Sequence, residues 1–128
     1  MKKTFDLFQI KLTDDEVDMV NAHGHSSVEK QEAKIEMTFA LSEKIYQLAE
    51  DAMANGFYTK VAKIKANDLE DMFRVGNLGV EDQIERLGSM ASPSVGDVVF
   101  AEGRGYYVIA PFGFTKMADA DAGKVVTA

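Results

Sequence analysis

The chain of 128 residues contains no cysteine and no long apolar run. Without thiols it can form no disulfide scaffold, thiolate nucleophile or thiolate zinc site, and it fits a reducing compartment. A membrane span needs about 18 or more consecutive apolar residues. Asp6, Gln9 and Lys11 interrupt the stretch that would follow Met1–Lys3 in a signal peptide. The sequence therefore predicts a soluble cytoplasmic protein that does not enter a membrane.

Positive charge is also scarce, with 14 lysines and arginines against 21 aspartates and glutamates and a formal net charge of −7. The phosphate backbone of nucleic acid repels such a chain unless its cations gather on one face. The one local basic cluster is Lys60, Lys63 and Lys65, which we interpret as a solvated strand face. The acidic balance therefore favours a protein or a cation as the partner over nucleic acid.

Length and composition predict a single domain. Hydrophobic residues make up 46% of the chain and charged ones 27%, which are ordinary proportions for a globular domain. A chain of this length can bury a core of its own. Residues 1–117 are predicted to form this domain. Residues 118–128 lack apolar periodicity and predict a disordered tail.

Local patterns predict a strand and a short helix at the start of the chain. Residues 4–12 alternate apolar and polar side chains, which is typical of a strand. Thr13 and Glu16 have the spacing of a capping box, in which each side chain satisfies a free amide at the start of a helix. A short helix is therefore expected from Thr13 on.

The strongest helix signal runs from residue 28 to residue 55. Apolar residues recur there at three-, four- and seven-residue steps and form a wide apolar face. Ser26 and Glu29 have a second capping-box spacing, and Asn55–Gly56 is a suitable end. We expect one long helix that lies across a sheet, with Ser42 as a point where it could break.

The rest of the chain predicts two more helices and four more strands. A strand over residues 58–65 precedes a helix that Asn67 and Glu70 would cap and Gly76–Asn77 would end. Leu69, Met72 and Phe73 would face inward from this helix. A short helix would carry Val80, Ile84 and Leu87, and residues 95–101, 106–110 and 112–114 would be strands around a glycine-containing hairpin turn.

Together these elements predict an α+β fold. We expect one antiparallel sheet of about four to six strands, with the long helix packed on one face and a C-terminal β-hairpin module. The expected core residues come from the helices and the C-terminal strands: Phe39, Leu41, Ile45, Leu48, Leu69, Phe73, Val98 and Val108.

No residues combine into a catalytic, metal or cofactor motif. His23 and His25 could share a metal ion with Glu29, but a polar loop with two exposed histidines is the simpler interpretation. The carboxylates of residues 14–18 complement the dipole at the start of a helix. The glycine pairs in 76–79 and 103–105 lack a phosphate-loop pattern. We therefore expect a protein that is not an enzyme and that uses no cofactor.

The candidate partner-binding site is an aromatic set near the C-terminus. Tyr106, Tyr107, Phe112 and Phe114 fall on adjacent predicted strands, and Arg104 lies in the turn before them. Base stacking would need a basic frame that the sequence lacks. The set is therefore interpreted either as a protein-binding patch or as part of the core. The edge strands could also pair two copies of the chain, so a homodimer is one expectation for its assembly.

Residues 57–117 resemble a known kind of protein. The segment Ser94-Val95-Gly96-Asp97-Val98-Val99, followed by Gly103, Gly105, Tyr107-Val108 and Gly113-Phe114, is similar to the ending of small proteins of tailed phages and mobile elements, including YodL-like domains. The opening over residues 5–13 is similar to proteins of marine cyanobacterial phages. The resemblance implies a phage accessory protein that acts in the host cytoplasm, but it implies no activity and no site residues.

The leading hypothesis is a non-enzymatic phage accessory protein that binds a host or phage protein. The alternative is a nucleic-acid-associated regulator that uses the C-terminal β module, with Lys60, Lys63, Arg104 and Tyr107 as contacts. An enzyme would need a pocket that joins carboxylates dispersed along the sequence. Gly96–Asp97 is interpreted as a tight turn, although a ligand-binding aspartate would produce the same pattern.

Overall fold

An antiparallel sheet forms the centre of the chain, in a computed structural model that describes residues 2–117 and 126–127. Six strands follow the order β3-β2-β1-β4-β5-β6. Their bounds are β1 Lys3–Ile10, β2 Tyr58–Ala66, β3 Ile84–Arg86, β4 Val98–Ala101, β5 Gly105–Ala110 and β6 Gly113–Lys116. A further short strand, β7 (Val126–Thr127), runs parallel to β2. The predicted α+β fold is confirmed, and the disorder expected for the rest of residues 118–128 lies outside the described residues.

Four helices accompany the sheet: α1 Asp14–His23, α2 Glu29–Thr38, α3 Ser42–Ala54 and α4 Leu69–Leu78. The predicted long helix over residues 28–55 is wrong, because the chain turns between α2 and α3. Leu41 is extended there, and its carbonyl accepts the first hydrogen bonds of α3. Phe39 (81% exposed) and Leu41 (62% exposed) lie in this turn and are not core residues. The turn lets Met37 and Ile45 face the same apolar cluster.

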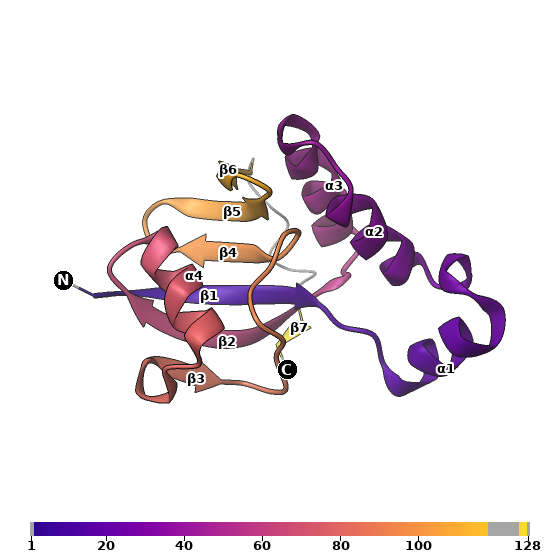
Figure 1. Ribbon diagram of the computed structural model, residues 1–128, viewed down its shortest axis with the longest axis horizontal. Coiled ribbons are helices and arrows are strands. Elements are labelled where there is room, and N and C mark those ends of the chain that lie inside the picture. The colour runs from indigo at the N-terminus through magenta and orange to yellow at the C-terminus, as the bar shows by residue number, and fades with distance from the viewer. Residues whose placement is uncertain (1, 118–125, 128) are drawn as a thin grey trace.

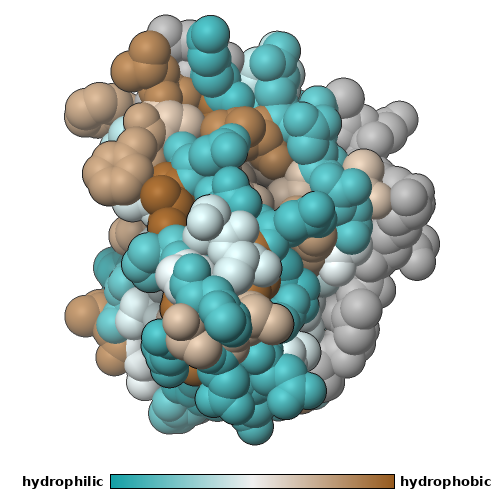
Figure 2. All heavy atoms as spheres, turned by 90° about the vertical axis from the view of Figure 1, so that its right-hand side faces the viewer, coloured by the Kyte–Doolittle hydropathy of each residue, from teal (hydrophilic) through white to brown (hydrophobic). Residues whose placement is uncertain are grey.

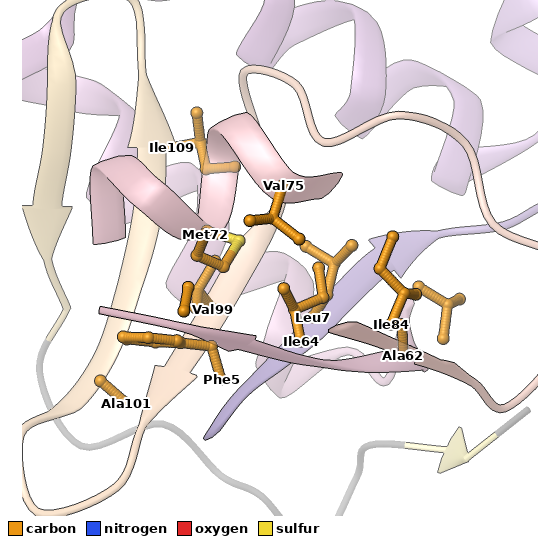
Figure 3. Packing of buried hydrophobic residues seen from close by; sticks show 12 residues of the cluster. Phe5, Leu7, Ala62, Ile64, Met72, Val75, Ile84, Val99, Ala101 and Ile109 are labelled. Atoms are coloured by element: carbon orange, nitrogen blue, oxygen red, sulfur yellow. The ribbon is translucent and has the colours of Figure 1, made fainter. Parts of the chain in front are cut away.

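Both faces of the sheet are apolar, and each is covered by helices (Figure 1). On one side, the α4 face, Met72 and Val75 point toward Leu7, Ile64 and Val99 (Figure 3). On the other side, the α3 face, buried residues of α3 and the end of α2 pack on the strands. The buried members of the α3 face are Phe8, Ile10, Met37, Ile45, Ala49, Ala52, Met53, Tyr58, Val98, Val108, Ala110 and Met117.

Several predicted core residues and element ends are confirmed. Ile45, Val98 and Val108 are fully buried, and Leu48 and Leu69 are partly buried against the two clusters. The capping box of Thr13 and Glu16 is present. These features depend on local sequence patterns, which act over a few residues.

Other local predictions are wrong by one or more residues. Asp68, not Asn67, caps α4 with its side chain, and α2 begins without the predicted Ser26 cap. Ile84 lies in β3, because pairing with the edge of β2 replaces the expected short helix. In the described part of the chain, no helix is both long enough and apolar enough to cross a membrane.

The face that α4 presents to the sheet differs from the predicted one. The sequence places Phe73 inward and ends the helix at Gly76, but Phe73 is 36% exposed and the helix continues to Leu78. Gly76 is buried inside the helix, where a Cβ atom would lie 2.6 Å from Cγ of Pro93. Gly76 thus shares the buried face of α4 with Met72 and Val75 and lets Pro93 approach closely, whereas Phe73 lies at the flank.

A pair of neighbouring substitutions tests this orientation. Met72→Ala removes a fully buried side chain and should lower the free energy of unfolding by about 2–5 kcal/mol. Phe73→Ala should cost less than about 1.5 kcal/mol, because much of that ring already contacts water. Urea denaturation measures both. A larger loss for Phe73→Ala than for Met72→Ala would show that the helix is turned the other way.

Gly76→Ala tests the contact with Pro93 separately. In most helix interiors this substitution stabilises the fold by about 0.5–1 kcal/mol. Here the added methyl group must displace Pro93, so we expect a loss of about 1–3 kcal/mol by urea denaturation. Gly79→Ala is no suitable control, since that residue has a positive φ of 69°. A rise in stability for Gly76→Ala would contradict the close approach.

Candidate functional site

A hollow of about 490 Å³ opens where β1 ends and β4 begins. Its walls come from residues 9–12 at the end of β1, Val17 of α1, the last turns of α2, and the connector between β3 and β4. In Figure 1 this connector passes in front of the right-hand end of the sheet. We call the hollow the connector pocket. It joins segments that are far apart in the sequence.

Gln9 holds the connector against β1. Its side chain is only 4% exposed. The amide nitrogen donates to the carbonyl oxygen of Ala91 at 2.8 Å and to Oδ2 of Asp97 at 3.0 Å. The amide oxygen accepts the backbone N–H of Ala91 at 3.0 Å. Because a buried amide is costly unless it is bonded, these three contacts make the position of the connector depend on Gln9.

The predicted turn at Gly96–Asp97 is present and forms one wall of the connector pocket. Oδ2 of Asp97 accepts the backbone N–H of Ser94 at 3.0 Å, and Gly96 has a positive φ of 94°. The hydroxyl of buried Tyr58 donates to the carbonyl oxygen of Gly96 at 2.6 Å. A Cβ atom on Gly96 would lie 3.3 Å from Cβ of Met37. The turn is therefore hydrogen-bonded to β2 and packed closely against α2.

Asp97 is the acidic group of the connector pocket, and its environment disfavours the charged form. Burial raises the pKa of Asp97 to about 7, although the hydrogen bonds from Gln9 and Ser94 and the charge of Lys34 oppose the rise. Burial and the nearby charge of Asp97 also raise the pKa of Tyr58 well above its ordinary value. The carboxyl group of Asp97 thus changes its charge near neutral pH.

The segment before α2 projects from the rest of the molecule (Figure 1). We call residues 13–27, which contain α1 and a short 3₁₀ turn, the arm. None of its residues is buried. Val17 is 41% exposed at the connector pocket, and Met19 is 45% exposed beside a second hollow of about 400 Å³. Val17 and Met19 are two positions apart in the helix, so they lie on different sides of α1 and line different hollows, and neither belongs to a core cluster.

Polar contacts connect the arm to the domain. Nζ of Lys30 lies 3.0 Å from Oε1 of Glu16 and donates to the carbonyl oxygen of Lys11 at 3.2 Å. Within the arm itself, the hydroxyl of Ser27 donates to the carbonyl oxygen of Met19 at 3.3 Å. These contacts are exposed or only partly buried, so they stabilise the position of α1 weakly.

The arm and α2 carry a large share of the negative charge. The arm has four carboxylates, at Asp14, Asp15, Glu16 and Asp18, and no lysine or arginine. Three exposed glutamates of α2 adjoin it: Glu29, Glu32 and Glu36. Figure 2 views this side of the molecule, where hydrophilic residues cover most of the surface and hydrophobic residues gather at its upper left margin.

The aromatic residues predicted as one binding site do not form one surface. Tyr106 lies on the α3 face, where its ring centroid is 4.8 Å from that of Phe100. Tyr107 and Phe114 pack against the opposite α4 face. Phe112 is 91% exposed in the turn after β5, and Arg104 is exposed in the turn before it, so these two lie at opposite ends of the strand.

The cations of the nucleic-acid alternative are also divided. Strand alternation places Lys60 and Lys63 on the α3 face, whereas Tyr107 lies on the α4 face. Nζ of Lys60 lies 3.3 Å from Oδ2 of Asp6, which offsets its charge. In the described residues, no group of three histidine or carboxylate side chains, including His23, His25 and Glu29, gathers as metal ligands would.

Two features of this region escaped the sequence-based prediction. Gln9 was taken only as a polar position of an alternating strand, because its partners lie 82 and 88 residues away. The exposure of Val17 was also missed, since an apolar helix edge normally predicts packing. Asp97 was signalled by the Gly96–Asp97 turn, but its partial burial and its bond to Gln9 depend on contacts distant in sequence.

The pKa of Asp97 makes its contribution to stability depend on pH. Because burial raises this pKa above the ordinary 3.8, the contribution is full below about pH 4 and is lost as the pH rises through about 7. Between pH 5 and pH 8 the wild type should lose about 2–3 kcal/mol of unfolding free energy relative to Asp97→Asn. Urea denaturation of both proteins at each pH measures the change.

The comparison with Asp97→Asn cancels the titration of the other carboxylates. Asparagine keeps an oxygen that can accept the Gln9 and Ser94 hydrogen bonds, so the turn should persist. Carbon-detected NMR should report a midpoint near pH 7 for the carboxyl carbon of Asp97. A midpoint near pH 4, or a stability difference that stays constant with pH, would contradict the burial of this group.

Comparison with known proteins assigns no family to the chain. No protein-family model matches it, and no curated protein or solved structure is significantly similar to it. The resemblance of residues 57–117 to small phage proteins therefore stays a prediction. Support for a function comes from the geometry of the arm and the connector pocket.

Proposed function

We propose that the chain is a non-enzymatic binding protein whose arm docks onto a partner protein. The observation that supports this proposal is that none of the residues of α1 is fully buried within its own chain, and only Glu16 and Val20 are partly buried. A helix of ten residues is too short to be stable in water without packing, since isolated helices need roughly 12–15 residues even to be marginal. A partner that covers Val17 and Met19 would supply the missing packing.

The charge of the arm defines the chemistry of this partner. The arm carries four carboxylates and no lysine or arginine, and Asp15, Glu16 and Glu29 line the hollow beside Met19. A complementary surface would offer an apolar groove edged by lysines or arginines, because opposite charges steer association and exclude wrong partners. The expected partner is therefore a protein with a basic-edged apolar groove.

The same charge argues against the two other occupants considered from the sequence. The arm would repel the phosphates of nucleic acid, and the cations proposed as nucleic-acid contacts do not share one face with Tyr107. The arms of two copies would repel each other, so a homodimer would need a different surface. The resemblance to phage proteins suggests that the partner is a host or phage protein in the host cytoplasm.

Site-specific crosslinking tests the docking of the arm. A photoreactive residue in place of Met19 should crosslink to a single protein in lysate of the infected host, because α1 would lie inside the interface. The same residue in place of Leu78, which is 67% exposed on α4, is the matched control and should give no such product. Crosslinks are identified by mass spectrometry after nuclease treatment.

Substitutions then test whether the apolar edge provides affinity. The double variant Val17→Ser, Met19→Gln keeps the charge of the chain and should weaken capture of the crosslinked protein at least tenfold, or about 1.4 kcal/mol. Leu78→Gln should leave capture unchanged. The proposal fails if the crosslink arises equally from position 78, or if nucleic acid alone is recovered and its binding falls steeply with salt.

A further inference from the structure

Asp97 lines the connector pocket, and only one of its two carboxyl oxygens accepts hydrogen bonds from the described part of the chain. Oδ2 of Asp97 accepts hydrogen bonds from the Gln9 side chain and from the backbone N–H of Ser94. Among the described residues, no donor reaches the other oxygen, Oδ1. A carboxylate can accept about four hydrogen bonds, so Asp97 has unused acceptor capacity beside a hollow of about 490 Å³.

The walls of the pocket combine an apolar lining with two cations near Asp97. Ile10, Met37, Met90 and Val95 contribute the apolar part of the lining. Lys11 and Lys34 are the charged residues that line the pocket besides Asp97. Lys34 is exposed to water, and Lys11 is partly exposed. The pocket is therefore suited to a ligand with a flexible apolar stem and a polar end.

We propose that this pocket receives the side chain of a lysine or arginine. The aliphatic stem would pack between Met37, Met90 and Val95, and the charged end would donate a hydrogen bond to Oδ1 of Asp97. Lysine and arginine side chains bury their stems against apolar surface in this way. The source of the side chain rests on the proposed function: it would belong to the basic partner that covers the arm, since Val17 of the arm lines the same pocket.

A cationic end fits the pocket better than an anionic one. The group with unused bonding capacity is an acceptor, and hydrogen bonds between charged partners are about twice as strong as neutral ones. Lys34 and Lys11 can keep their ammonium groups in water, so they need no anion for their solvation. An anionic group next to Oδ1 would instead be repelled by the charged carboxylate of Asp97.

Small probes test the pocket without the partner. At pH 8, where Asp97 is charged, n-butylguanidinium and n-butylammonium should produce saturable amide NMR shifts at Ala91, Ser94 and Asp97. Butanol and butyrate, which have the same stem, are the matched probes and should bind at least tenfold more weakly. Equal binding of butanol would show an apolar pocket only, and stronger binding of butyrate would reverse the proposed charge; either result overturns the proposal.

Three variants assign the binding to Asp97. Asp97→Asn should weaken the binding of the cationic probes at least tenfold. Asp82→Asn, which changes an exposed aspartate outside the pocket, should leave their binding unchanged. Lys34→Gln should strengthen cation binding, because it removes a nearby positive charge. Weaker cation binding by Lys34→Gln, or unchanged binding by Asp97→Asn, would contradict the proposed site.

The pH dependence gives an independent readout. Protons compete with the cationic probe for Asp97, so binding should be weaker at pH 6 than at pH 8, and a saturating probe should lower the pKa of Asp97. Lys11 and Lys34 are the other charged groups that line the pocket. Binding that is independent of pH would argue against contact with Asp97.

The partner assay separates this inference from the proposed function. If the side chain belongs to the partner, Asp97→Asn should weaken capture of the crosslinked protein while Asp82→Asn does not. Probe binding combined with unchanged capture would overturn the assignment to the partner and identify a free amine as the ligand. Loss of the Met19 crosslink combined with normal probe binding would refute docking of the arm but leave the chemistry of the pocket intact.

Discussion

The hydrogen bonds of the buried Gln9 amide hold the connector in place, and much of the structure depends on them. They join the end of β1 to Ala91 and Asp97 across more than 80 residues of sequence. Between these two anchors lies Pro93, which packs on Gly76 on the buried face of α4. Loss of the amide would leave buried polar groups unbonded and would also release the contact of Pro93 with α4.

The turn at Gly96–Asp97 extends the same constraint to the other side of the sheet. The carbonyl oxygen of Gly96 accepts a hydrogen bond from the hydroxyl of Tyr58. Gly96 also packs against Met37, so the end of α2 contacts the connector as well. The arm has no comparable anchor, because the contact of Glu16 with Lys30 is polar and partly hydrated. The sheet and the connector are thus held by buried hydrogen bonds, whereas Val17 and Met19 of the arm are exposed in the described part of the chain.

Short-range patterns predicted much of the fold, and long-range contacts account for the errors. The capping box at Thr13 and Glu16 and the strand at residues 58–65 involve neighbours in sequence and were predicted correctly. The possible break at Ser42 agrees with the start of α3, but the continuous apolar stripe favoured one long helix, so Phe39 was misplaced in the core. Phe73 was misplaced because the contact between Gly76 and Pro93 is tertiary. The candidate site was anticipated only at Gly96–Asp97, since the role of Gln9 depends on residues that no local pattern connects to it.

Amide hydrogen exchange of the isolated chain compares the local stability of the arm with that of the sheet and α3 most directly. Local stability follows buried apolar contacts, so the amides of α1 should exchange almost as fast as those of an unfolded peptide. The amides of β1 and α3, which contribute buried residues to the core, should exchange only through global unfolding. Protection of α1 equal to that of α3 would contradict the account, because it would mean that the arm is stable without a partner.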